Sequence, residues 1–412
     1  MSSISLIIII IIVLSFLYDL IISLLNFKYR KDPVPDVVSD VYDQKEYKKF
    51  LDYSLEKYRT KIMSKAIILL ITILIIVFNG FQLVEEVTLN ITANTHLQTI
   101  LFLTLYYAIF YIVSVVVEYY DNFSVEERYG FNKSTKKLFV KDQFNELIIT
   151  IGLGAVVVYI LSLIYYSVGN MFYVYAFIIL TIGIILFNIL FVKLIMPLFY
   201  KQSPLEDGEL KEKITALSMK VGYEVKDVVI IDASKRSTKL NAYFSGIGKY
   251  KKVMLFDTLL DKLTTDEILS AVAHEIGHSK HKHMISDLIS SIIKLGIYLA
   301  LFSLVLKTNV FTNAFGLANN NLGFGLVIFI LLFSLMSKLL SYISNTISRT
   351  HEYGADMFVE KEGLGDALIT ALKKVAKENL GNLNPHPVFV KANYNHPPLV
   401  TRINYIKKGQ QS

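Results

Sequence analysis

Residues 264–306 read TTDEILSAVAHEIGHSKHKHMISDLISSIIKLGIYLALFSLVL, and this stretch combines two kinds of helix. Its first half starts with Thr264 and has Glu267 three residues later, the capping-box pattern that begins a helix. Its second half, Asp287–Leu306, is almost continuously apolar and long enough to cross a bilayer. No helix breaker separates the halves, so the sequence predicts one helix that continues from the cap into a membrane.

The composition of the whole chain also indicates a membrane protein. Of 412 residues, 53% are hydrophobic and only 19% are charged, which is too apolar for a soluble protein of this length. There is no cysteine, which excludes disulfides, thiolate metal sites and cysteine nucleophiles. The net charge of +7 is interpreted as excess base on the cytoplasmic face of a membrane protein, so no nucleic-acid partner is expected.

Seven apolar stretches are long enough to span a bilayer. The first lacks a basic leading region and a small-residue cleavage site, so we interpret it as a retained helix. The short loop Ser167–Met171 predicts a helical hairpin between the fourth and fifth spans. The predicted spans are Ile4–Leu25, Ala66–Val84, Gln98–Val117, Leu147–Tyr166, Phe172–Met196, Asp287–Leu306 and Leu322–Ser341.

The connecting loops alternate in charge. Phe27–Lys65 contains ten Lys or Arg residues and Glu118–Glu146 contains five, whereas Glu85–Leu97 and Ser167–Met171 contain none. Because basic loops stay in the cytoplasm, the N-terminus is expected outside or in a lumen, and the C-terminus in the cytoplasm. The predicted segments are 1–199 with five spans, 200–286 with a zinc-peptidase pattern, 287–345 with two spans, and 346–412 with the C-terminal helices.

Several polar residues interrupt the predicted spans. Two interpretations remain open for them, namely that they extend toward the membrane interface or that they line a water-filled interior. These residues are Asp19, Asn79, Asn188, Lys193, Lys294 and Lys338.

Residues 200–286 are more polar and mix helix and strand patterns. Glu209–Val221 has helical periodicity, and Val228–Asp232 is a short β-type run. Asn241–Ser245 and Val253–Phe256 are predicted strands joined through a turn with Gly246 and Gly248. Extended peptides often add as a strand to an exposed sheet edge, and Asn241–Ser245 is the expected edge, with Asn241, Ala242 and Tyr243 as substrate-binding candidates.

Within the quoted stretch, His274 and His278 are four residues apart, so a helix presents both imidazoles on one face where they can share a metal. Glu275 lies beside them and can take a proton from an attacking water. This is the H-E-x-x-H pattern of zinc peptidases. His281 could compete as a ligand, although we interpret His281 and His283 as surface or interfacial residues.

A catalytic zinc site requires a third protein ligand. Glu352, which follows the seventh predicted span, is the candidate, and Asp356 lies one helical turn later on the same face. Asp356 could accept the free N–H of a ligating histidine. The alternative is that both carboxylates belong to a solvated helix face.

The chain resembles the type 1 CAAX prenyl proteases, which are integral-membrane zinc endopeptidases, over nearly its whole length. The strings that carry the resemblance occur in the family's order. They are Tyr29-Arg30 with Pro33 and Pro35, Glu127–Lys133, Lys141–Gln143, Pro204–Gly208, Ser234–Ser237, Asn241–Phe244, Leu255–Leu259, His274–His278, Glu352–Asp356 and His396–Pro398.

The resemblance implies a fold and a site. The fold is a barrel of seven transmembrane helices around a hydrated chamber, capped by a small α+β zinc-peptidase domain. The implied ligands of one Zn²⁺ per chain are His274, His278 and Glu352, with Glu275 as general base and Asp356 behind the ligands. Asn241, His396 and Arg402 match residues that hold the peptide backbone or stabilise the oxyanion. The implied substrates are C-terminal CAAX peptides, prenylated or not, met at the lipid bilayer.

Two other functions are possible for such a sequence. A heat-shock-type membrane metalloprotease shares the zinc motif but usually has about four spans, and the seven predicted here argue against it. A non-catalytic transporter or zinc scaffold needs no general base, so Glu275 argues against that class.

Overall fold

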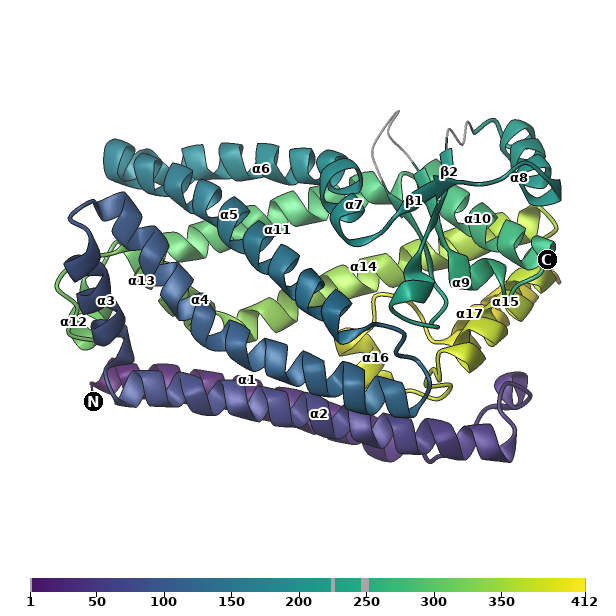
Figure 1. Cartoon of the computed structure of the whole chain (residues 1–412), viewed down its shortest axis with the longest axis horizontal. Helices are drawn as coiled ribbons and strands as arrows, with labels where there is room; N and C mark the ends of the chain where they lie inside the picture. The colour runs from purple at the N-terminus through teal and green to yellow at the C-terminus, as the bar shows by residue number, and fades with distance from the viewer. Residues whose placement is uncertain (1, 224–226, 246–251, 412) are drawn as a thin grey trace.

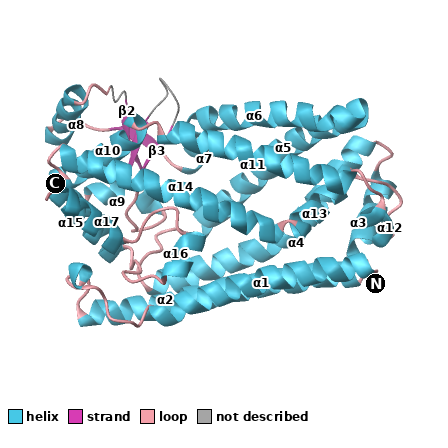
Figure 2. Ribbon diagram, turned by 180° about the vertical axis from the view of Figure 1, so that it is seen from behind, coloured by secondary structure: helices cyan, strands magenta, loops and turns pink. Residues whose placement is uncertain are grey.

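The computed structural model describes residues 2–223, 227–245 and 252–411. The molecule is elongated and built mostly from long helices (Figure 1). The N-terminus lies at one end, near α3 (Gly80–Ile91) and α12 (Val310–Ala314). The described strands gather near the opposite end, as the view from behind also shows (Figure 2). The chain therefore separates a helical body from a mixed domain at one end.

Six described helices are long and apolar enough to cross a membrane, and a bent pair makes a seventh span if counted as one. The bent pair is α13 (Leu322–Leu332) with α14 (Ser334–Lys361), and it turns by 65°. The six are α1 (Ser3–Tyr29), α2 (Gln44–Val77), α4 (Thr95–Tyr120, continued by π-helical turns to Glu126), α5 (Lys136–Val168), α6 (Phe172–Leu190) and α11 (His283–Leu306).

Two predicted spans are too long at their C-terminal ends. α2 ends at Val77, and Asn79 adopts a left-handed conformation (φ 55°) before α3 begins. Asn tolerates this conformation better than most residues, so it can end a helix within an apolar run. After α6 the chain continues as a π-helical segment, Phe191–Ile195, and α7 (Met196–Phe199). The predicted α5–α6 hairpin is confirmed, because only the 3-10 turn Gly169–Met171 separates the two helices.

The expectation that one helix runs from Thr264 into the membrane is wrong. The capping box forms as predicted and starts α10 (Thr265–Lys280), but Lys282 has a positive φ of 57° and α11 starts at His283. The two helices pack into different cores. Ile276 of α10 lies in the core of the mixed domain, whereas Phe302 of α11 lies in the core between membrane helices. A single straight helix could not place its two halves in both of these cores.

A small sheet of four strands supports α10. Its order is β1-β2-β4-β3, in which β2 and β4 are parallel and the other pairs antiparallel. β3 lies at an edge, as expected, whereas three-residue β1 was not predicted because it is too short to show a pattern. The predicted Gly246–Gly248 turn lies outside the described residues. The strands are β1 (Gln202–Pro204), β2 (Asp227–Ile231), β3 (Ala242–Ser245) and β4 (Lys252–Phe256).

Short helices complete the mixed domain, and all but α9, which packs on β4, lie against α10 or α14. They are α8 (Glu209–Lys220), α9 (Asp257–Leu260), α15 (Gly365–Glu378), α16 (Pro387–Asn393) and α17 (Leu399–Gly409).

Some polar residues of the spans bond to one another. Asp19 accepts hydrogen bonds from Lys65 at 2.5 Å and from Lys338 at 2.6 Å, so Lys338 is neutralised within the helical body. The Asn188 amide donates to the carbonyl of Ile184 in its own helix. Lys338 and Asn188 are thus explained by local partners, whereas Lys193 and Lys294 keep both interpretations.

The contact between α10 and α14 depends on Gly277. A Cβ added there would lie 3.1 Å from Cβ of Phe358 and 3.2 Å from Cα of Ala355, which is closer than most carbon–carbon contacts. The missing side chain therefore allows the two helix backbones to approach.

We expect Gly277→Ala to lower the stability of the folded protein by about 1–3 kcal/mol, because the added methyl overpacks the α10–α14 contact. The melting temperature of the purified protein measures this. Gly154→Ala in α5 is the matched control, since a Cβ there would meet nothing within 4 Å. Equal melting temperatures for the two variants would contradict this account of the contact.

Candidate metal centre

α10 and α14 together carry the expected ligand set. His274 and His278 lie one turn apart on α10, and Glu352 comes from the middle of α14. One side-chain ligand atom from each residue lies within 4.8 Å of the others. His274 and Glu352 are buried, and His278 is half-buried, so the group has one more open side.

The spacing of these atoms matches a metal site. Nε2 of His274 is 3.1 Å from Nε2 of His278 and 3.3 Å from Oε2 of Glu352, and Nε2 of His278 is 3.2 Å from Oε1 of Glu352. Tetrahedral ligands at about 2.0–2.1 Å from zinc are roughly 3.3 Å apart. Oε2 of Glu352 is also buried without a hydrogen-bond partner. The residues present therefore fit a zinc ion.

The surroundings of His274 favour positive charge. Burial and Arg402 oppose a proton on this ring, but Asp356 and Glu352 outweigh them and raise its pKa to about 9. A divalent cation bound at Nε2 would supply the positive charge that these carboxylates favour, and His274 would then stay unprotonated.

Asp356 and Arg402 form a buried support behind the ligands. Oδ1 of Asp356 lies 3.1 Å from Nδ1 of His274, so the carboxylate can accept the ring N–H and aim Nε2 at the metal position. The Arg402 guanidinium holds Asp356 through two hydrogen bonds of 2.9 and 2.6 Å, and also lies 3.5 Å from Glu352. This geometry makes Arg402, on α17, a positioning residue for the ligands.

His283 holds the other histidine ligand, a contact that our interpretation of it as a surface residue missed. Nδ1 of His283 is 3.0 Å from Nδ1 of His278. His283 in turn stacks on His351, with ring centroids 4.2 Å apart, and Nδ1 of His351 lies 3.3 Å from Asp287. The available signal was that four of the eight histidines lie between residues 274 and 283. His281 is exposed, and its ring stacks on that of His283 with centroids 5.4 Å apart.

Glu275 is half-buried beside the ligands, and no described residue hydrogen-bonds to its carboxylate. Burial raises the pKa of Glu275 above its ordinary value, with the neighbouring histidines opposing the shift. A carboxylate that is free of partners and shifted toward neutrality is suited to accept and return a proton.

The candidate substrate-binding residues and His396 lie outside the group of three candidate ligands. Nε2 of His396 lies 3.2 Å from Oε1 of Glu352, and its side chain is 60% exposed, so it borders the open side of the site. Asn241 is exposed, and its side-chain oxygen accepts the N–H of Ala242 in β3, which lies against α10. The side chain of Tyr243 lies outside the described part of the structure.

Comparison with known proteins identifies the family. A model of the CAAX prenyl protease N-terminal region with five membrane helices matches residues 23–201, and a model of peptidase family M48 matches residues 204–410. The CAAX prenyl protease 1 of Saccharomyces cerevisiae is 30% identical over 93% of this chain and 91% of its own. The chain belongs to the CAAX prenyl protease 1 family of M48 peptidases.

Further relatives support the assignment. A probable CAAX prenyl protease 1 of Schizosaccharomyces pombe is 32% identical over 92% of this chain and 82% of its own. The crystal structure of S. mikatae Ste24p superposes with a TM-score of 0.91 at 30% identity, covering 98% of this chain and 99% of that one. The expected multi-pass membrane metalloprotease is confirmed, the expected helical barrel agrees with the Ste24p match, and the heat-shock and non-catalytic alternatives are not favoured.

Removing the His283 ring should weaken metal binding, because His278 would lose the group that orients it. We expect His283→Ala to raise the zinc dissociation constant about 10- to 100-fold, as measured by competition with a chromogenic chelator. His281→Ala removes a neighbouring exposed ring and should leave the constant unchanged. Equal effects of the two substitutions would mean that His283 does not position the ligand.

Proposed function

We propose that this membrane protease uses one zinc ion, held by His274, His278 and Glu352, to hydrolyse peptide bonds near the C-terminus of CAAX-type substrates, prenylated or not. The observation that carries the proposal is the ligand triangle with the unpaired Glu275 carboxylate beside it. The substrate class rests on the relatives, which are CAAX prenyl proteases.

Zinc in such a site polarises a carbonyl group and lowers the pKa of water. Glu275 takes the proton of the attacking water and returns it to the amine that leaves when the C–N bond breaks. His396, on the open side, donates a ring N–H to the carbonyl oxygen as negative charge develops there. Asp356 and Arg402 keep His274 oriented throughout.

The peptide lies along the free edge of β3 in this proposal. β3 pairs only with β4 among the described strands, so its outer edge can hydrogen-bond an extended chain. Asn379 steadies this edge, since its side chain accepts the N–H of Leu240 at 2.8 Å and donates to the Leu240 carbonyl at 3.0 Å. Asn241 and Ala242 follow directly and face the incoming peptide backbone.

We further propose that the N-terminus lies outside or in a lumen and that the metal centre faces the cytoplasm. α1 starts at one end of the molecule, and the mixed domain lies at the other (Figure 1). The basic stretch Phe27–Lys65, which runs from the end of α1 into α2, lies on the side of the mixed domain, and by the positive-inside rule that side would be cytoplasmic.

Glu275→Gln tests the mechanism directly. Gln has nearly the same shape but cannot accept the water proton, so turnover should fall by at least about 10²- to 10⁴-fold while zinc content and melting temperature stay unchanged. Zinc by elemental analysis and cleavage of a fluorogenic CAAX peptide are measured on one preparation. Asp266→Asn removes an exposed carboxylate from the same helix and should keep full activity.

Activity of Glu275→Gln within a few-fold of the wild type would refute Glu275 as the base. Cleavage of peptides without a CAAX sequence at equal rates would refute the proposed substrate class and leave the hydrolytic mechanism standing.

Cysteine labelling tests the orientation, because the chain has no native cysteine. Ala93 between α3 and α4 and Gln411 near the C-terminus are both exposed. In intact cells or sealed vesicles, a membrane-impermeant maleimide should label Ala93→Cys from outside, and Gln411→Cys only after permeabilisation. The opposite pattern would place the metal centre on the other side of the membrane.

A further inference from the structure

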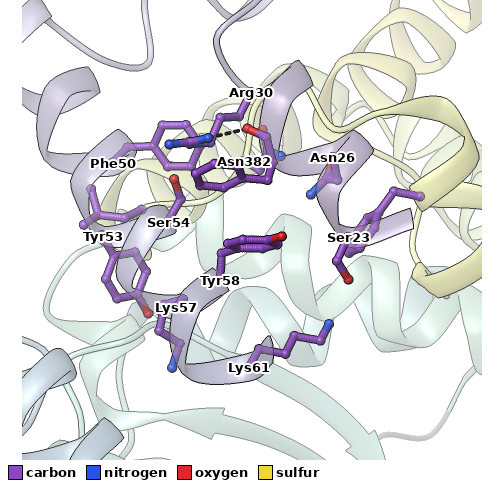
Figure 3. Close-up of a pocket in the computed structure, with 13 residues that line it drawn as sticks. Ser23, Asn26, Arg30, Phe50, Tyr53, Ser54, Lys57, Tyr58, Lys61 and Asn382 are labelled. Carbon is purple, nitrogen blue, oxygen red and sulfur yellow. Dashed lines mark hydrogen bonds between the residues drawn. The ribbon is translucent and has the colours of Figure 1, made fainter. Parts of the chain in front are cut away.

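A cavity of about 320 Å³ lies between the C-terminal half of α1, the N-terminal half of α2 and residues 380–389. Figure 3 shows Arg30 on one side of it, Lys57 and Lys61 on the other, and Tyr58 between them. Most of the lining surface is apolar, with polar and charged side chains set among six apolar or aromatic ones. This cavity shares no lining residue with the metal centre.

Arg30 is a buried cation with no ion-pair partner among the described residues. Its side chain is 5% exposed and its guanidinium carbon lies 3.5 Å from the centre of the Phe27 ring. One terminal nitrogen donates to the Phe27 carbonyl, but Nε is buried with no hydrogen-bond partner. No described carboxylate forms an ion pair with it. A buried charge left unpaired in this way is costly, which points to a missing anionic partner.

The two lysines that line the cavity differ in whether a carboxylate pairs with them. Lys57 is neutralised by Asp121 at 2.6 Å and Glu126 at 2.8 Å. Lys61 forms no ion pair with any described carboxylate and lies 5.6 Å from the centre of the Phe389 ring. Neither Arg30 nor Lys61 therefore has a described carboxylate at ion-pair distance, and the cavity keeps excess positive charge.

The depth of the cavity in the membrane identifies the kind of anion. The apolar part of α1 ends near Leu25 and that of α2 begins near Ala66, so Arg30 and Lys61 each lie about five residues beyond it. At about 1.5 Å per helical residue this is roughly 7 Å outside the hydrocarbon core, which is the depth of lipid headgroups. Basic pockets between membrane helices at this depth bind anionic headgroups.

We propose that this cavity binds an anionic phospholipid, with the phosphate on Arg30 and the glycerol region against the aromatic lining. Phe27 and Tyr58 stack with ring centroids 4.4 Å apart and provide a flat apolar wall. Lys61 adds positive potential on the opposite side. The mixture of apolar wall and unpaired cation suits an amphiphile better than a free anion or a peptide carboxylate.

Native mass spectrometry of the full-length protein in mild detergent tests the proposal, with phosphatidylglycerol titrated against phosphatidylcholine. We expect the wild type to retain phosphatidylglycerol preferentially and Arg30→Gln to lower its bound fraction roughly tenfold or more, since hydrogen bonds to charged groups are the strong ones. Lys31→Gln is the matched control, because Lys31 is adjacent, carries the same charge and is exposed.

Equal retention by Arg30→Gln and wild type, or an equal fall in Lys31→Gln, would overturn the proposal. Should Arg30→Gln fail to fold, Lys61→Gln at a more accessible position decides, with a several-fold fall supporting the site and no fall overturning it. Displacement of the lipid by inorganic phosphate alone would reassign the cavity to a free anion. Displacement by a CAAX peptide but not by its C-terminally amidated form would reassign it to the substrate carboxylate.

Discussion

The close crossing of α10 and α14 at Gly277 is the constraint on which the candidate metal centre depends. Two of the candidate ligands come from α10 and the third from α14, so no single helix can build the site. The two imidazole nitrogens and the two Glu352 oxygens reach distances of 3.1 to 3.3 Å because the helix backbones nearly touch, and a side chain at position 277 would push the backbones apart. The second variable position of the H-E-x-x-H string is thus a packing position as much as a spacer.

Electrostatics complete the same site. Glu275, Glu352 and Asp356 bring three carboxylates together, and Arg402 supplies one guanidinium. With neutral histidines, this group has two negative charges in excess, which a divalent cation neutralises. Asp356 is fully buried, and such a carboxylate is stable only with excellent pairing, which the two hydrogen bonds from Arg402 provide. The buried pair therefore supports the metal centre and depends on α17 for its cation.

Much of this could be predicted from the sequence, because apolar length and side-chain spacing are local signals. The spans, the capped helix at Thr264 and the edge position of β3 follow from such patterns. The turns at Asn79 and Lys282 could not be predicted, since a single left-handed residue costs little and is selected by the packing on either side of it. The 65° bend between α13 and α14 likewise contains no proline that would announce it. Arg402 and His283 contact the candidate ligands only because the fold brings these side chains together. No spacing pattern in the sequence indicates such a contact.

The break between α10 and α11 at Lys282 also brings His283 into contact with His278. If α10 continued straight into α11, His283 would lie about 140° around the helix from His278 and point away from it, since residues five apart do not share a face. The left-handed turn at Lys282 redirects the chain, and Nδ1 of His283 comes to lie 3.0 Å from Nδ1 of His278. The same turn directs α11 into the membrane core while α10 stays in the mixed domain. The boundary between the membrane and the peptidase domain is therefore also the point at which the second histidine ligand is held in place.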